Sequence, residues 1–282
     1  MKTFFKKSIL LSIICSAFFF VNITAQNVLD GTYIKEHVPK RKFIPYTPLR
    51  EADVMWSKRV WRTIDLREKV NHPLYFPTSK INDRRSLFDV IKDAVVTGQL
   101  TAYGNPVLDD EFKEPMTKTA IEKLFCHKDT NYVENVDNGQ QEPVVVDVCI
   151  GSAEIKQYWI KEDWFFDKQR SVMDVRIIGI APLVEKKNEA GEVTGYSPMF
   201  WIYFPEARPI FANAEVYNRS NNAERRTLED IFWKRQFGSY IRKVDNVYDR
   251  NINEYKQGLD ALLEAETVKE DIFTFEHDLW HF

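Results

Sequence analysis

The sequence predicts an α+β fold, with mixed antiparallel sheets, flanking helices and an extended N-terminal arm. Segments of β-branched and aromatic residues and segments with helical spacing both occur, but they do not alternate in regular strand–helix–strand units with glycine turns. Hydrophobic content is 44% and charged content is 29%, as in folded globular proteins. With only 10 glycines among 282 residues, the chain is not expected to form a glycine-rich cofactor cradle or low-complexity disorder.

The first 25 residues have the layout of a secretory signal peptide. Three lysines begin the segment: Lys2, Lys6 and Lys7. An apolar run over residues 8–21 follows, and we expect cleavage between Ala25 and Gln26. The run is shorter than the ~20 residues that span a bilayer, so a retained membrane anchor is the less favoured alternative.

The mature protein is expected to be soluble, unlipidated and acidic. Ile14 precedes Cys15, whereas a lipidated cysteine normally follows a small residue, and Cys15 lies inside the apolar run rather than at its end. Removing residues 1–25 takes away three lysines and no acid, which moves the formal charge from −3 to −6. An acidic protein is a poor candidate for nucleic-acid binding, which usually needs a basic face.

Residues 26–50 read as an extended arm rather than as packed structure. Three prolines, Pro39, Pro45 and Pro48, interrupt the segment and stand among scattered basic residues. Residues 51–282 then form the predicted α+β domain. Two lobes, 51–150 and 151–282, are an alternative reading of that stretch.

Four helices are predicted after one or two helical turns in residues 50–59. They cover residues 83–98, 117–125, 227–233 and 254–271. In the first of them, Leu87, Val90, Ile91 and Ala94 recur at helical spacing, and Gly98 stands where a helix ends. The last helix is mostly polar and carries four apolar residues: Leu259, Leu262, Leu263 and Val268.

Strands are predicted where β-branched and aromatic residues gather. They cover residues 60–66, 144–150, 155–164, 172–180 and 199–204. Residues 155–164 and 172–180 are expected to form a hairpin that turns at residues 167–169. The apolar run 144–150 reads as a buried strand, and the polar stretches 129–141 and 186–195 read as a loop and a turn.

Cys126 and Cys149 remain after processing. In an oxidising compartment they could form a disulfide across the polar stretch between them, which would stabilise the fold by about 3 kcal/mol on the chain-entropy model. Two free buried thiols are the alternative, since sequence does not show whether the Cβ atoms meet. A zinc site with His127 is disfavoured because the paired spacing of structural zinc ligands is missing.

Catalytic motifs are absent from the sequence, and we expect no catalytic residue, no cofactor and no metal. There is no nucleophile elbow, phosphate-binding loop or zinc-protease helix motif. His277 and His281 have helical metal spacing, but two histidines at the end of the chain read better as surface groups.

The aromatic residues favour a protein that buries surface against partners. Aromatic content is 14%, and several tryptophans stand among charged residues. The candidate partner-interface residues are Trp56, Trp61, Trp159, Trp164 and Trp280. Core packing is the alternative for any one of them.

Six blocks of sequence resemble the GldN/PorN family. In order, they are residues 68–77 (EKVNHPLYFP), 83–90 (DRRSLFDV), 164–168 (WFFDK), 176–182 (RIIGIAP), 204–208 (FPEAR) and 275–280 (FEHDLW). The resemblance spans roughly residues 50–282. The N-terminal arm and residues 126–149 look less typical of the family.

The resemblance implies a part of the gliding-motility and type IX secretion machinery of Bacteroidota. It implies a periplasmic ring subunit at the inner face of the outer membrane, which self-associates and binds a GldK/PorK-like lipoprotein. The ring would meet GldM/PorM-like and GldL/PorL-like motor proteins, so any membrane association would come through partners. The family has no known catalytic residues to transfer.

Two other classes of function remain alternatives. A secreted hydrolase would show a deep pocket with two or more titratable groups whose pKa values are perturbed. A periplasmic ligand-binding module would show an apolar cavity with a few convergent polar groups. A structural subunit would instead present aromatic surfaces without a convergent polar site.

Overall fold

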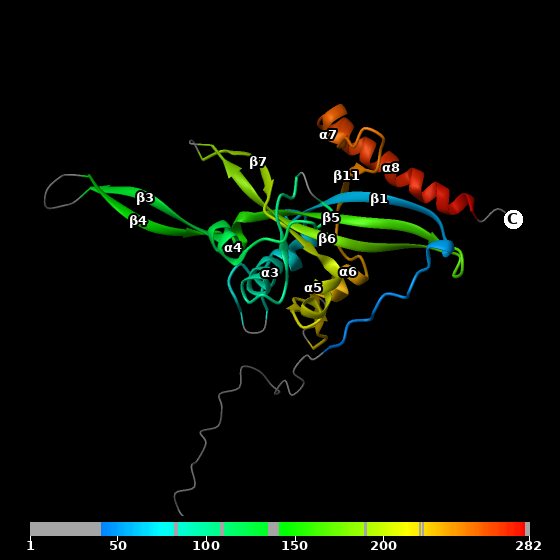
Figure 1. Cartoon of the computed structure of the whole chain (residues 1–282), viewed down its shortest axis with the longest axis horizontal. Helices are drawn as coiled ribbons and strands as arrows, with labels where there is room; N and C mark the ends of the chain where they lie inside the picture. The colour runs from blue at the N-terminus through cyan, green and yellow to red at the C-terminus, as the bar shows by residue number, and fades with distance from the viewer. Residues whose placement is uncertain are drawn as a thin grey trace, which may run out of the picture. The chain divides into compact units, whose positions relative to one another are not determined.

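A seven-stranded antiparallel sheet organises the part of the chain that the computed structural model describes (Figure 1). The described residues are 41–81, 84–107, 110–134, 141–188, 191–219, 221 and 223–279. The strand order is β11 (Tyr240–Val244), β1 (Val54–Asp65), β5 (Ile155–Asp167), β6 (Val172–Lys187), β8 (Trp201–Tyr203) and β2 (Ala102–Tyr103), and β7 (Val193–Pro198) also pairs with β6. The predicted α+β class is confirmed. The signal peptide with Ala25 and Gln26, residues 26–40 of the arm, and Trp280 lie outside the described residues.

The β5–β6 hairpin is the centre of the sheet and confirms the predicted pairing. Its register runs from Ile155 opposite Val184 to Asp167 opposite Val172. The turn is held by Asp167, whose Oδ1 accepts a hydrogen bond from the Gln169 amide at 2.9 Å. The hairpin is longer than predicted, because β6 continues through residues 181–187 to pair with β7, where the sequence suggested only a polar turn at 186–195.

A layer of helices packs on the sheet and encloses the main core. These helices are α2 (His72–Tyr75), α3 (Leu87–Val96), α4 (Lys118–Phe125), α5 (Phe204–Phe211) and α6 (Leu228–Trp233). Ser86, Thr117 and Thr227 each accept a hydrogen bond from the amide three residues later, so the first turns of α3, α4 and α6 are capped. The helices predicted over 83–98, 117–125 and 227–233 are thereby confirmed, with shorter bounds.

A second, smaller core lies under α8 (Leu259–Asp278). The helix buries Ala261, Ala265 and Ile272 against β1, β11 and the short helix α7 (Ile252–Tyr255). The helix predicted over 254–271 exists but begins and ends later. Its three leucines, Leu259, Leu262 and Leu263, are exposed, because the helix contacts the sheet through Ala261, Ala265 and Ile272.

A two-stranded ribbon, β3 (Cys126–Glu134) with β4 (Gln141–Cys149), follows α4 and stands outside the main sheet (Figure 1). The loop predicted over 129–141 is therefore wrong for residues 129–134, which form β3. The strand predicted over 144–150 exists, but it is not buried in the sheet, since Asp147 and Cys149 are exposed. The remaining short elements are η1 (Glu51–Asp53), η2 (Lys69–Asn71), η3 (Ser152–Glu154), β9 (Glu215–Val216) and β10 (Arg226–Thr227).

The domain does not divide at residue 150. Strands β1 and β2 come from the first half and β5, β6, β8 and β11 come from the second, and β1 lies between β11 and β5 in one sheet. The two lobes considered for 51–150 and 151–282 are therefore one body. Residues 50–59 hold a single 3-10 turn, η1, and then enter β1 earlier than predicted.

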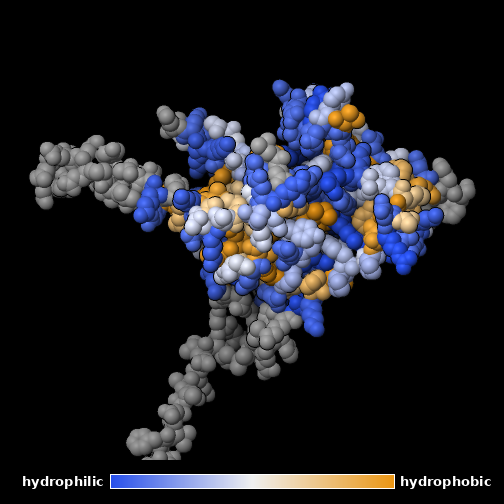
Figure 2. Space-filling model, viewed as in Figure 1, coloured by the Kyte–Doolittle hydropathy of each residue, from blue (hydrophilic) through white to orange (hydrophobic). Residues whose placement is uncertain are grey.

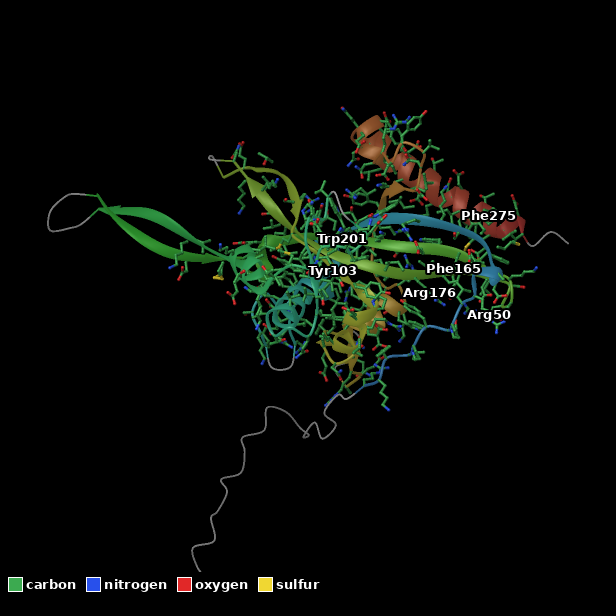
Figure 3. All side chains as sticks on the ribbon, viewed as in Figure 1. Arg50, Tyr103, Phe165, Arg176, Trp201 and Phe275 are labelled. Carbon is green, nitrogen blue, oxygen red and sulfur yellow. A yellow bond between two sulfur atoms is a disulfide. The ribbon has the colours of Figure 1, made fainter. Side chains whose placement is uncertain are left out.

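Residues 41–50 are extended, as predicted, but they are packed on the domain rather than free. Arg41 forms an ion pair with Asp230 at 2.6 Å, and the Ile44 carbonyl accepts a hydrogen bond from Arg208 Nη2 at 2.6 Å. Arg176, which lies beside Phe165 in Figure 3, donates to the Thr47 carbonyl at 2.6 Å. Backbone carbonyls of the arm that accept from Arg208 and Arg176 therefore hold it in place, without strand pairing to the sheet.

Candidate interaction surface

One face of the sheet is covered by a loop rather than by helices, and two of the predicted tryptophans lie there. Strand alternation places Trp61 of β1 and Trp159 of β5 on this face, with Trp201 of β8 beside Tyr103 (Figure 3). The loop after β2 lies over them. Trp61 Nε1 donates to Asp110 Oδ2 at 2.8 Å, and Trp201 Nε1 donates to the Pro106 carbonyl at 3.0 Å.

Lys161 is buried under the same loop. It is 2% exposed, and its Nζ lies 2.5 Å from the Asp110 carbonyl oxygen and 3.3 Å from Asp110 Oδ1. Burial lowers the pKa of Lys161, and the nearby Asp110 opposes that shift. Gly179 makes room for the arrangement, since a Cβ at this position would meet the Phe112 ring at 2.6 Å. The contacts of Lys161 with Asp110, and the space that Gly179 leaves for the Phe112 ring, therefore hold the loop against the sheet.

Beside the loop a cavity of about 660 Å³ remains open, and Arg242 is one of the cations that line it. The guanidinium carbon of Arg242 lies 3.7 Å from the centre of the Trp159 ring. Burial lowers the pKa of Arg242 to about 10. Its Nε is buried without a hydrogen-bond acceptor among the described residues, whereas the neighbouring Lys243 pairs with Asp249 at 2.5 Å.

The Arg242 charge therefore opposes folding at neutral pH. A folded-state pKa below its ordinary value means that the unfolded chain holds this proton more tightly, so stability rises as pH increases above about 10. We expect Arg242→Met to raise the free energy of unfolding by about 1 kcal/mol at pH 7, since a desolvated, incompletely paired charge is removed. Urea unfolding of both proteins checks this, and a loss above about 1 kcal/mol would show that stacking on Trp159 outweighs the desolvation cost.

The cavity is lined mostly by charged side chains. Its described lining contains no serine, threonine, cysteine or histidine. Two of its carboxylates are engaged, Asp249 by Lys243 and Glu254 by Asn251 Nδ2 at 2.5 Å. Among the described residues no group of three or more acids, histidines and cysteines could hold a metal ion. Within the same residues, none of the helices has the length and apolar character needed to cross a bilayer.

The four described tryptophans of the predicted interface are packed to different degrees. Trp61 belongs to the core, Trp159 is half-buried under Arg242, and Trp56 stacks on Phe275 at 4.7 Å. Trp164 is half-buried, with Nε1 donating to Glu162 Oε2 at 3.1 Å. Their interface role stays a prediction. Large side chains that are more than half exposed, which tryptophan content did not reveal, include Leu259, Leu262, Leu263, Phe273, Val247 and Tyr248.

Cys126 and Cys149 are joined in a disulfide at the base of the β3–β4 ribbon. The two residues face each other in the strand register, and their Cα atoms are 4.1 Å apart. The Ile150 amide donates to the Phe125 carbonyl at 2.8 Å directly behind the bond. The disulfide therefore links the first residue of β3 to the last residue of β4, so the base of the ribbon is covalently closed.

Replacing both cysteines by serine is expected to lower the free energy of unfolding by about 3 kcal/mol, because the unfolded chain regains the freedom of a 23-residue loop. Chemical unfolding of the oxidised protein and the double variant measures the difference. Wild-type protein in reducing agent is the matched control and should lose a similar amount. A change below about 0.5 kcal/mol would mean that the ribbon melts independently of the domain.

Comparison with known proteins finds a family whose model matches most of the chain. No protein of curated function matches the chain by sequence. Residues 49–281 match the family described as gliding motility associated protein GldN. This match starts near η1 and runs through α8, so it covers the sheet, both cores and the ribbon. The resemblance found in the sequence blocks is confirmed, and the chain belongs to the GldN family of gliding motility associated proteins.

Proposed function

We propose that this chain is a non-catalytic structural subunit of the type IX secretion and gliding-motility machinery, and that it forms a periplasmic ring with an outer-membrane lipoprotein. The observation that carries the proposal is the family match across residues 49–281. The lipoprotein partner is a GldK/PorK-like protein, and the ring meets GldM/PorM-like and GldL/PorL-like motor proteins.

Export to the periplasm is part of the proposal. The lysines and apolar run of residues 1–25 support removal of a signal peptide before Gln26. The Cys126–Cys149 bond supports the same location, since disulfides persist in oxidising compartments such as the bacterial periplasm. In this setting the mature subunit is held at the outer membrane by its lipidated partner.

A structural role is favoured over catalysis by what the described surface offers. The cavity beside Trp159 is lined by charged side chains and has no serine, threonine, cysteine or histidine in its described lining. Large hydrophobic side chains are exposed in clusters instead, most densely on α8. Contiguous exposed apolar surface marks protein–protein contact in soluble proteins.

Native size analysis of the chain coexpressed with its candidate lipoprotein partner tests the proposal. We expect a co-purifying, roughly equimolar particle far larger than one heterodimer. The chain expressed alone is the matched control for self-association without the lipoprotein. A monomer that ignores the lipoprotein in every preparation would contradict the ring-subunit role.

A further inference from the structure

The outward surface of α8 carries a leucine cluster that no described residue covers. Leu259, Leu262 and Leu263 are 70%, 51% and 58% exposed. Their spacing of three and four residues places them on one side of the helix. Figure 2 shows a mostly hydrophilic surface with a few hydrophobic atoms in the region where α7 and α8 lie. A partner that covers this cluster would gain apolar burial at each leucine.

The charged side chains of α8 are almost all negative. Asp260, Glu266, Glu270 and Asp271 are exposed on α8, and Lys269 is the single lysine or arginine of the helix. Lys269 already pairs with Glu266 at 2.6 Å. A second α8 would bring acids against acids, so this surface is unsuited to a two-fold contact with itself. It fits an apolar surface that is edged by basic residues.

The same chain presents such a surface in a groove beside α2. The groove encloses a cavity of about 340 Å³, and its apolar walls are Pro73, Phe76, Pro77, Ile81 and Tyr217. The side chains of Phe76, Ile81 and Tyr217 are exposed. The cavity is open to solvent along these rings and can receive an aliphatic side chain of a neighbouring molecule.

Basic residues surround this groove. Lys69, Arg84 and Arg219 line it together with His72, and the described lining contains no carboxylate. The guanidinium of Arg84 lies 5.4 Å from the centre of the Tyr217 ring. No carboxylate among the described residues forms an ion pair with these three cations. The groove therefore complements α8 in both apolar character and charge.

We propose that the leucine cluster of α8 docks into the α2 groove of a second copy of this chain. This inference rests on the proposed ring, and it assigns the contact between neighbouring subunits. The two surfaces differ, and they belong to elements that pack in different cores, α8 on β11 and α2 on α3. A contact between unlike surfaces is heterologous, so each subunit can bind one neighbour on each side and the series can close into a ring.

Mixed cysteine cross-linking distinguishes this geometry from the alternatives. Leu263→Cys and Phe76→Cys are made in separately tagged chains, coexpressed with the lipoprotein partner and oxidised. We expect one covalent dimer that carries both tags from the mixture, no dimer from either variant alone, and a ladder of multimers from the double variant. Val247→Cys paired with Phe76→Cys is the matched control, since Val247 is exposed but outside α8, and it should give no ladder.

Charge reversal gives a second test that does not depend on oxidation. Glu266→Lys with Glu270→Lys, or Lys69→Glu with Arg219→Glu, should each lower the assembled fraction at least about tenfold, which corresponds to ~1.4 kcal/mol. Combining all four changes in one chain should restore assembly. Thermal unfolding of each variant, expected to match the wild type, confirms that the fold is intact.

The outcomes separate this inference from the proposed function. A wild-type particle that still assembles while no ladder forms and charge reversal has no effect would overturn the α8–groove contact and leave the ring role standing. Dimers formed by the Leu263→Cys variant alone would show that α8 contacts a second α8 in a two-fold arrangement instead of the groove. Loss of lipoprotein binding with the subunit series intact would assign α8 to the lipoprotein. A wild-type chain that never assembles would overturn the proposed function itself.

Discussion

Replacing Arg208 by alanine is expected to destabilise the domain by about 3–5 kcal/mol, because Glu229 would be left as a buried carboxylate without its cation. Arg208 is 1% exposed, and its Nε and Nη2 donate to Glu229 Oε1 at 2.8 and 2.6 Å. The other carboxylate oxygen of Glu229 is buried without a hydrogen-bond partner. The Tyr46 ring lies 4.2 Å from the guanidinium carbon, so the arm would also lose one of the contacts that hold it.

The pH dependence of this loss follows from Glu229. Burial raises the pKa of Glu229 above its ordinary value of 4.5, and Arg208 opposes that shift. Without Arg208 the folded-state pKa rises further, and a raised pKa opposes folding most when the pH lies above it. The loss should therefore be largest at pH 7 and should shrink as pH falls toward 4.5.

Urea unfolding at pH 7 and pH 5 measures the Arg208 effect. Lys269→Ala, which removes an exposed ion pair with Glu266, is the control and should change stability by less than about 0.5 kcal/mol. Arg208→Met with Glu229→Leu should recover most of the loss, because no buried charge remains. A pH-independent loss would mean that arm packing, rather than the stranded carboxylate, carries the effect.

Phe232→Ala is the second large change, with an expected loss of about 4 kcal/mol. Phe232 of α6 is buried among aromatic rings, with centroids 5.3 Å from Phe204, 5.8 Å from Phe211 and 5.7 Å from Phe237. Removing it leaves a cavity that three rigid rings cannot fill without leaving their rotamers. Thermal unfolding measures the loss.

Phe273→Ala is the matched control for Phe232→Ala. Phe273 is 68% exposed on α8, so the same truncation should change stability by less than about 0.5 kcal/mol. Equal losses from the two variants would contradict the division between the aromatic core under α6 and the open side of α8.

Local signals in the sequence predicted much of this fold. Residues 155–180 show β-prone runs on both sides of a polar turn, and a hairpin needs no information from elsewhere in the chain. Thr227 precedes apolar residues at helical spacing, which marks the start of α6, whereas the helix predicted from residue 83 begins only after its N-cap Ser86. Strand β3 was missed because its polar residues pair with β4 rather than entering the sheet, so alternation gave no signal.

The surfaces proposed for contact were harder to predict than the elements. The apolar residues of α8 did not show which side of the helix is buried: Ala261 and Ala265 face the sheet, and the buried side depends on the tertiary partner. Tryptophan content directed attention to Trp61 and Trp164, whose rings are engaged within the domain. The α2 groove combines residues from 69–84 with Tyr217 and Arg219, which only the tertiary fold brings together.

The covalently closed base of the β3–β4 ribbon also determines where a mechanical load is carried. A pull on the far end of the ribbon cannot separate the two strands at their base, because Cys126 and Cys149 are bonded there. Tension passes instead into α4, which ends at Phe125, and into the segment that leads from Ile150 to β5. In the oxidised protein the ribbon is therefore joined to the domain at two points of the main chain. After reduction, only the backbone hydrogen bonds between β3 and β4 would oppose separation of the two strands.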